Sequence, residues 1–242
     1  MKVVGVIPAR YSSSRFPGKP LIDLKGKTMI QRVYEGVSKS SILSEVIVAT
    51  DDQRIYDAVK GFGGKVQLTS TEHTTGTDRC GEIAQTIEAD VIINIQGDEP
   101  LVDFRQIDQL ASVFADTRIQ IASLGIKSND ADDLANHNRI KIVLDHNKDA
   151  LYFSRSPIPN TKNASNLALD NFNYFRHIGV YAYRKETLSQ LVQLEPTLLE
   201  KLESLEQLRW MYHGYAIRIV ETDIETPNID VPSDLEKVLA HL

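Results

Sequence analysis

A loop that carries three cations follows the first apolar run of the chain. Arg10, Arg15 and Lys19 stand in it with several serines and Gly18, directly after the apolar residues 3–7. Open α/β sheets bind ligands at the carboxyl ends of their strands. Backbone N–H groups of such a loop can surround an anion, and cationic side chains can hold it. The loop therefore predicts a polyphosphate site, although it contains neither a P-loop string nor the dinucleotide string G-x-G-x-x-G.

Carboxylates elsewhere in the chain could hold a metal ion beside this phosphate site. Asp98 and Glu99 follow the apolar run 90–96, and Asp230 stands near the end of the sequence. Mg²⁺ is commonly held by one or two carboxylates together with phosphate oxygens and water. Asp98 is the first expected ligand, whereas Glu99 has capping or orienting the turn as its alternative role. For Asp230 the sequence leaves two roles open, a metal ligand or a helix cap ahead of Pro232.

A third candidate segment, Gly76-Thr77-Asp78-Arg79, opens a helical stretch. The N-terminus of a helix presents free N–H groups to an acceptor. Backbone groups of a glycine-containing turn can supply both a hydrogen-bond donor and an acceptor to a ligand. The alternative is an ordinary helix cap formed by Thr75 or Thr77.

The elements that must position these residues alternate over the first half of the chain. Strands are expected at 3–7, 45–50, 65–69, 90–96 and 120–126. Between them, apolar residues recur at helical spacing in segments that begin near Ile30, Ile55 and Ile107. Strands that are buried on both faces and separated by helices predict a mainly parallel sheet with right-handed crossovers.

The pattern changes after residue 126. Asp145–Lys148 reads as a turn between two strand-like runs, 140–144 and 149–154, which predicts a hairpin. We therefore expect 127–185 to form an antiparallel insertion beside the main sheet, within a single domain that spans 1–242. The remaining expected elements are a strand at 174–183, an amphipathic segment at 198–213, a strand at 216–221 and a last helix capped by Ser233.

Composition narrows the classes of function. The chain has 242 residues and a net charge of −6, so binding to nucleic acid or to an acidic membrane is not expected. Cys80 is the only cysteine, which precludes an intrachain disulfide and agrees with a reducing cytoplasm. The first apolar run is too short for a signal peptide, and no run reaches the roughly 20 apolar residues of a membrane helix.

Eight segments of the sequence resemble those of the CMP-KDO synthetases, the 3-deoxy-manno-octulosonate cytidylyltransferases, in order and in approximate spacing. The segments are Pro8–Pro20, Ala49–Asp52, Gly76–Arg79, Asn94–Pro100, Ala150–Arg155, Arg176–Tyr181, Leu205–Arg209 and Asp230–Pro232. The resemblance extends from the first residues to the last helix. It implies a Rossmann-like α/β nucleotidyltransferase fold.

The resemblance also implies roles for the residues at the nucleotide end. Arg10, Arg15 and Lys19 would hold the triphosphate of CTP, and Asp98 and Asp230 would bind Mg²⁺. Two further groups would contact the nucleotide: Pro8, Ala9 and Ser13 along its length, and Gly76, Thr77 and Arg79 at its base and ribose.

A second set of residues would bind the sugar. Each is polar in apolar surroundings, and each alone is more typical of a satisfied core or surface group. As a set they match the family's sugar-acid pocket: Gln96, Asn138, Lys141, Arg155, His177, Tyr181, Glu206 and Gln207. An arginine can hold the carboxylate of a sugar acid through two hydrogen bonds.

The family resemblance implies transfer of CMP from CTP to KDO, with release of pyrophosphate, for lipopolysaccharide assembly. It also implies a homodimer formed through 127–185. The chain departs from the family in the loop that follows Pro159, where many relatives carry an aromatic residue. Two alternatives stay open: a cytidylyltransferase for 8-amino-KDO or another sugar acid, and a nucleotide-binding protein without catalysis.

Overall fold

The computed structural model describes residues 1–12, 16–160, 174–227, 229 and 234–242. The strands are β1 (Val3–Ala9), β2 (Leu43–Thr50), β3 (Val66–Leu68), β4 (Val91–Asn94), β5 (Ile121–Ser128), β6 (Lys141–Leu144), β7 (Ala150–Ser154), β8 (Tyr174–Arg184) and β9 (Ile217–Thr222). The helices are α1 (Met29–Val37), α2 (Gln53–Gly61), α3 (Gly76–Thr86), α4 (Phe104–Ser112), α5 (Ala131–Ala135), α6 (Lys185–Leu191), α7 (Leu198–Glu203), α8 (Gln207–Tyr212) and α9 (Leu235–Leu239).

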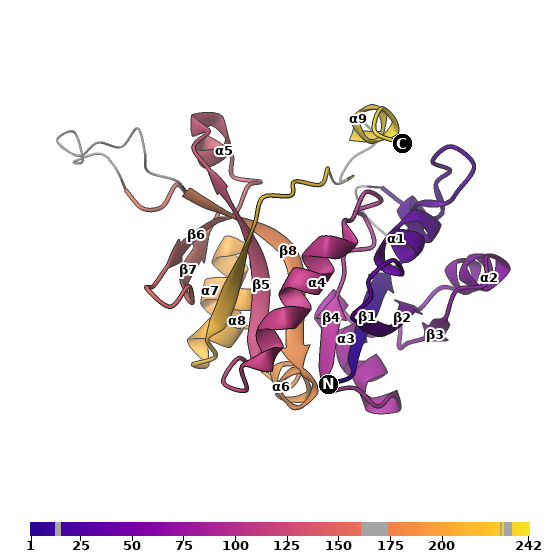
Figure 1. The fold of residues 1–242 in the computed structure, drawn as a ribbon, viewed down its shortest axis with the longest axis horizontal. Helices are drawn as coiled ribbons and strands as arrows, with labels where there is room; N and C mark the ends of the chain where they lie inside the picture. The colour runs from indigo at the N-terminus through magenta and orange to yellow at the C-terminus, as the bar shows by residue number, and fades with distance from the viewer. Residues whose placement is uncertain (13–15, 161–173, 228, 230–233) are drawn as a thin grey trace.

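One twisted sheet organises the molecule, with strand order β3-β2-β1-β4-β8-β5-β9 (Figure 1). The pairs β3–β2, β2–β1, β1–β4 and β5–β9 are parallel, and β8 runs antiparallel to both of its neighbours. The prediction of a mainly parallel sheet with antiparallel strands is confirmed.

Helices cover both faces of the sheet because its strands bury side chains alternately on either side. In β1, Val3 and Ile7 face the core that is closed by α1, α2 and α4, whereas Val4 and Val6 face the core closed by α3, α6 and α8. Thr28 caps α1 by accepting from the backbone of Gln31. None of the helices that the structure describes is long and apolar enough to cross a membrane.

Segment 127–185 is not set apart from the main sheet. It contains the predicted hairpin of β6 and β7, which pairs with β8 through β6. Strand β8, however, lies between β4 and β5 near the middle of the sheet. The antiparallel segment therefore joins the two parallel parts of the sheet and brings its own side chains to the centre of the molecule.

The predicted amphipathic segment 198–213 is two helices. Thr197 and Glu200 form a capping box at the start of α7. Ser204 then adopts a left-handed conformation with φ of 52°, which ends α7 before α8 begins. At the C-terminus, α9 begins after Asp234, and the predicted cap Ser233 lies outside the described residues.

A small apolar cluster, which we call the tail cluster, is separate from both sheet cores. Its buried members are Leu24, Met29, Ile229 and Val238. The cluster packs the C-terminal segment against the region that follows the first loop. It thereby brings residue 229 close to the carboxyl end of the parallel strands.

Candidate active site

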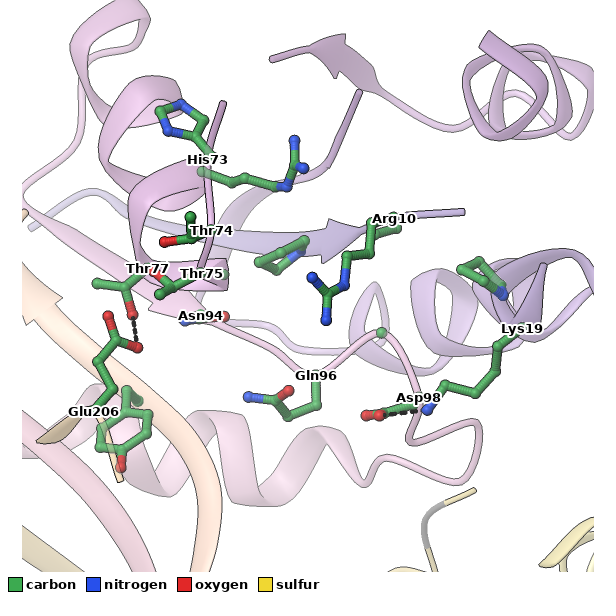
Figure 2. A pocket seen from close by; sticks show the side chains of 17 residues that line it. Arg10, Lys19, His73, Thr74, Thr75, Thr77, Asn94, Gln96, Asp98 and Glu206 are labelled. Carbon is green, nitrogen blue, oxygen red and sulfur yellow. Dashed lines mark hydrogen bonds and ion pairs between the residues drawn. The ribbon is translucent and has the colours of Figure 1, made fainter. Parts of the chain in front are cut away.

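A cavity of about 360 Å³ opens where β1 and β4 end and α3 begins (Figure 2). It is lined by Pro8, Ala9, Arg10, Lys19, Pro20, His73, Thr74, Thr75, Gly76, Thr77, Arg79, Asn94, Gln96, Gly97, Asp98, Tyr181 and Glu206. Five stretches that are distant in sequence thus meet at one edge of the sheet. This is the edge at which open α/β sheets bind ligands.

The two described cations of the first loop differ in their surroundings. The Lys19 ammonium lies 2.8 Å from Asp98 Oδ2 and donates to the carbonyl oxygen of Ile229 at 2.7 Å. Arg10 is exposed at the cavity, and its side chain makes no hydrogen bond or ion pair within the described part of the chain. An exposed guanidinium of this kind is available to an incoming anion. The predicted residues Ser13 and Arg15 lie outside the described residues.

Asp98 sits on a turn that passes very close to β1. A Cβ atom placed on Gly97 would lie 2.9 Å from the carbonyl oxygen of Pro8, so only glycine fits there without a backbone shift. The backbone carbonyl of Asp98 also accepts a hydrogen bond from Ile229 N at 3.1 Å. The tail cluster therefore fixes the residue before Asp230 against Asp98, although Asp230 itself lies outside the described residues.

The surroundings of Asp98 suit a cation. Its carboxylate already faces the ammonium of Lys19, which occupies a cation position on the cavity wall. Among the residues that the structure describes, no three His, Cys, Asp or Glu side chains cluster as a metal site. Mg²⁺ can be held by one or two carboxylates together with phosphate oxygens, so the magnesium site stays a prediction.

The start of α3 forms the opposite side of the cavity. Thr75 and Asp78 form a capping box, so the predicted cap is present. Gly76 lies against the ring of Pro8, where an added Cβ would come within 3.3 Å of Cγ. Thr77 donates its hydroxyl to Glu206 Oε2 at 2.9 Å. The first turn of α3 therefore presents its backbone to the cavity from a fixed position.

Arg79 lines the cavity, but both terminal nitrogens of its guanidinium are bonded to protein groups. One terminal nitrogen donates to Thr69 Oγ1 at 2.7 Å and to the carbonyl of Ser70 at 3.1 Å, and the other pairs with Asp51. The side chain is only 4% exposed. These contacts fasten the loop before α3 to the end of β2. Arg79 therefore supports the wall in this structure, and the nucleotide contact that the family resemblance implies stays a prediction.

Three predicted sugar residues also reach the cavity. Gln96 donates its Nε2 to the carbonyl of Gly179 at 2.7 Å. Tyr181 packs edge-on against the ring of Trp210, with centroids 5.1 Å apart. Desolvation raises the pKa of the Glu206 carboxyl, while the Thr77 hydroxyl opposes that rise. Figure 2 shows Gln96 between the Lys19–Asp98 pair and the Thr77–Glu206 pair.

Five other predicted sugar residues do not line this cavity: Asn138, Lys141, Arg155, His177 and Gln207. Asn138 is exposed. Lys141 is buried and donates to three backbone carbonyls, those of Asn136, Arg139 and Arg155, and burial lowers its pKa. Arg155 donates to the carbonyls of Glu203 and His137. Lys141 and Arg155 thus satisfy backbone carbonyls in the hairpin region.

His177 and Gln207 lie behind the cavity. Desolvation lowers the pKa of His177 to about 3, so its ring is neutral at any working pH. Its Nε2 contacts Ser123 Oγ at 2.8 Å. Gln207 is buried, and its Nε2 has no partner among the described residues. Both residues adjoin the sugar side without facing the cavity.

Sequence reasoning missed several residues that line the cavity, among them His73, Thr74 and Asn94. The Nε2 of His73 pairs with Glu82 Oε2 at 2.5 Å. The available signal was position: His73 and Thr74 directly precede the capped start of α3, and Asn94 ends β4. Residues at the carboxyl ends of parallel strands and before helix N-termini share the ligand-binding edge.

Comparison with known proteins places this site in a family. The family model described as cytidylyltransferase matches residues 4–222. A 3-deoxy-manno-octulosonate cytidylyltransferase from Parabacteroides distasonis is 51% identical, with 100% of this chain and 98% of that protein covered. One from Geotalea daltonii is 47% identical, with the same coverage.

Solved structures agree with these sequence relatives. A CMP:2-keto-3-deoxy-manno-octonic acid synthetase complexed with CTP superposes with a TM-score of 0.93 at 45% identity, covering 100% of this chain and 98% of the other. A 4-diphosphocytidyl-2C-methyl-D-erythritol synthase from Anaerococcus prevotii, 13% identical with a TM-score of 0.64, shares the fold, with 99% and 98% covered. With its cavity at the carboxyl edge of the sheet and a family match over most of its length, the chain belongs to the cytidylyltransferase family.

Proposed function

We propose that this protein activates 3-deoxy-manno-octulosonate (KDO) by transferring CMP to it from CTP, with release of pyrophosphate. One observation carries the proposal. One cavity joins the cations and carboxylate of the phosphate end to the polar side chains of Tyr181 on β8 and Glu206, which precedes α8. Full-length similarity to relatives that are named for this reaction supports it. The protein would act in the cytoplasm, and its product would serve lipopolysaccharide assembly. The net charge of −6 disfavours nucleic acid as a partner.

The phosphate end would bind and orient the nucleotide. Arg10, Arg15 and Lys19 would hold the triphosphate and stabilise the charge that develops on the departing pyrophosphate. The 2-hydroxyl oxygen of the sugar acid would form the new bond to the α-phosphorus as the bond to the β-phosphate oxygen breaks. Most of the acceleration would come from positioning and electrostatic stabilisation.

Asp98 and Asp230 would hold Mg²⁺. When bound, the ion would supply positive charge to the α-phosphate and lower the pKa of the attacking hydroxyl. Lys19 would then exchange its present contact with Asp98 for a phosphate oxygen. Ile229 would keep the C-terminal segment against the Asp98 turn through its backbone N–H.

The sugar end would bind and recognise the second substrate. Gln96, Tyr181 and Glu206 would bind its hydroxyl and carboxylate groups directly, since these side chains line the cavity. Lys141, Arg155, His177 and Gln207 would shape the wall behind them. The base of CTP would lie against the first turn of α3, where Thr75, Gly76 and Thr77 face the cavity.

The test is a pyrophosphate-release assay with CTP, UTP, ATP and GTP against KDO, 8-amino-KDO and a neuraminic acid. We expect the largest kcat/KM with CTP and KDO. A preference for 8-amino-KDO would change the sugar but keep the cytidylyltransferase. Faster release with UTP or ATP would contradict the choice of base. No release with any pair would favour a nucleotide-binding protein without catalysis.

We also propose a homodimer in which the hairpin region takes part. Leu151 on β7 and Leu198 and Leu202 on α7 are large apolar side chains, 59%, 73% and 75% exposed. The two elements adjoin, because Ser154 Oγ donates to Glu203 Oε1 at 2.7 Å. Exposed apolar groups beside an edge strand are typical of an interface. Sedimentation should show a dimer for the wild type and a weaker dimer for Leu202→Glu. A monomer for both the wild type and Leu202→Glu would contradict the proposed dimer.

A further inference from the structure

Strand β8 carries a bulge where it passes β5. Ser123 pairs with Tyr181, but the next residue, Leu124, pairs with Ile178, so Gly179 and Val180 are extra residues on β8. A bulge bends its strand and changes the direction of nearby side chains, and bulges are frequent beside active sites. This bulge directly precedes Tyr181, a residue of the cavity wall.

The hydroxyl of Ser123 holds the bulge from across the ladder. It donates to the carbonyl of Val180 at 2.8 Å and lies 3.3 Å from that of Ile178. Ser123 is completely buried. The carbonyl oxygens of Ile178 and Val180, on either side of Gly179, therefore both lie near the Ser123 hydroxyl. An alanine at position 123 would have no hydroxyl for these contacts.

His177 completes the arrangement. Because the Ser123 hydroxyl gives its proton to a carbonyl, its oxygen accepts from His177 Nε2 at 2.8 Å. With this direction of the hydrogen bond, we assign the proton of the neutral ring to Nε2. Its Nδ1 is buried and has no partner among the described residues. His177, which does not line the cavity, thus holds the Ser123 hydroxyl in place through this hydrogen bond.

The bulge in turn fixes a side chain of the cavity. The carbonyl of Gly179, inside the bulge, accepts the hydrogen bond from Gln96 Nε2 at 2.7 Å. With its NH₂ group so engaged, Gln96 can offer its amide oxygen to a substrate hydroxyl. On the other side of the bulge, Tyr181 is held edge-on to Trp210.

We infer that Ser123 is a positioning residue for the second substrate. It pins the β8 bulge, and through the bulge it orients Gln96 and Tyr181 toward the sugar end of the cavity. The inference rests on the proposed function, because it assigns the sugar end to Gln96 and Tyr181. Ser123 touches no substrate itself.

The experiment compares Ser123→Ala with Thr187→Val in steady-state kinetics with CTP and KDO. Thr187 is a matched control, since it is buried and donates its hydroxyl to Gln120 Oε1 at 2.7 Å, before the start of β5. Ser123→Ala should raise the KM for KDO roughly five- to tenfold, as expected for a displaced hydrogen-bonding group. The KM for CTP should stay within about twofold in both variants.

Two further readouts separate positioning from general destabilisation. Trp210 is the only tryptophan and packs on Tyr181 and Tyr183, so its fluorescence spectrum should shift in Ser123→Ala but not in Thr187→Val. In a Gln96→Ala background, Ser123→Ala should change the KM for KDO by about twofold or less, because coupled residues are not additive.

Equal effects of Ser123→Ala on the KM for CTP and for KDO would overturn the inference. So would an undiminished effect in the Gln96→Ala background. If Ser123→Ala does not fold, Ser123→Cys, which keeps a weak donor, should raise the KM for KDO alone. An inactive wild-type protein would instead refute the proposed function, so the two failures are distinguishable.

Discussion

The cavity has two sides that are built differently. On the α3 wall, residues 69–79, polar groups are bonded to one another: Arg79 to the preceding loop, and Thr75 to Asp78. On the charged wall, formed by Arg10, Lys19 and Asp98, the contacts are few and join distant segments. A wall whose polar groups are hydrogen-bonded to one another gives the cavity its shape. A wall whose charges are incompletely paired can bind a ligand and stabilise charge that develops during a reaction. Substitutions on the two walls should therefore fail in different ways.

The largest effect is expected at Asp98. Asp98→Asn keeps the size of the side chain but removes the negative charge that would hold Mg²⁺, so turnover should fall about a hundredfold or more. CTP and KDO turnover across a Mg²⁺ titration is the measurement. Asp103→Asn is the matched control, because Asp103 caps α4 and asparagine caps as well. Near-normal turnover in folded Asp98→Asn would remove Asp98 from the chemistry.

Lys19→Ala should weaken CTP binding more than it affects the fold. A lost charge-assisted contact is worth about 1.5–3 kcal/mol, or roughly 10- to 150-fold in affinity. Isothermal calorimetry with CTP measures it. Lys27→Ala serves as the control, because Lys27 pairs with Glu35 on the surface. Unchanged CTP affinity in Lys19→Ala would move the triphosphate away from the charged wall.

Arg79→Lys, in contrast to Lys19→Ala, should affect the stability of the fold more than CTP binding. The lysine keeps the charge but cannot serve Thr69, Ser70 and Asp51 together, so the free energy of unfolding should fall by roughly 1–3 kcal/mol. Urea denaturation gives this value, and calorimetry should find CTP affinity reduced less than in Lys19→Ala. Full stability with a large loss of CTP affinity would instead make Arg79 a direct ligand contact.

Thr75→Ala tests the α3 wall more gently. Loss of the capping hydroxyl should lower the free energy of unfolding by about 1 kcal/mol. Thr75→Ser retains the cap and should remain close to the wild type. Thermal unfolding of the two variants under identical conditions makes the comparison, and equal destabilisation of both would show that the cap is unimportant.

The smallest expected effect is a pH dependence from Glu206. Since desolvation raises its pKa in the folded protein, the folded state binds its proton more tightly than the unfolded state. Its contribution to stability is therefore greatest at acid pH, and it declines as pH rises from the ordinary carboxyl pKa through the raised one. Glu206→Gln should gain stability relative to the wild type over that range, as urea denaturation from pH 4 to 8 can show. A constant difference would refute this linkage.

The charged end of the cavity was predictable because its residues lie in short contiguous motifs at the ends of strands. Pro8–Arg10 includes the last two residues of β1, and Gln96–Asp98 follows β4. Parallel strands bring such ends to one edge. The sugar end was less predictable. Lys141 and His177 look like ligands by residue type, but their partners are a set of carbonyls and a buried serine. Only the tertiary structure brings those partners to them.

The fold was likewise predictable from the sequence only in part. Apolar runs identified most of the strands, since the central strands β1, β2, β4 and β5 bury side chains on both faces. The position of β8 between β4 and β5 was not contained in its sequence, because a strand's neighbours depend on the packing of the whole sheet. The break at Ser204 was also missed, because a serine in a left-handed conformation carries no strong local signal.

The location of β8 has a consequence for how the chain folds. Gln96 and Gly179, which meet across the cavity, are 83 positions apart in the sequence. The ladder between β4 and β8, from Val91–Arg184 to Asn94–Tyr181, brings them together. Loop closure over such a separation is slow compared with the local pairing of β1 with β2 through α1. We therefore expect Gln96 and Gly179 to meet only once β8 has entered the sheet, after β1 and β2 have paired.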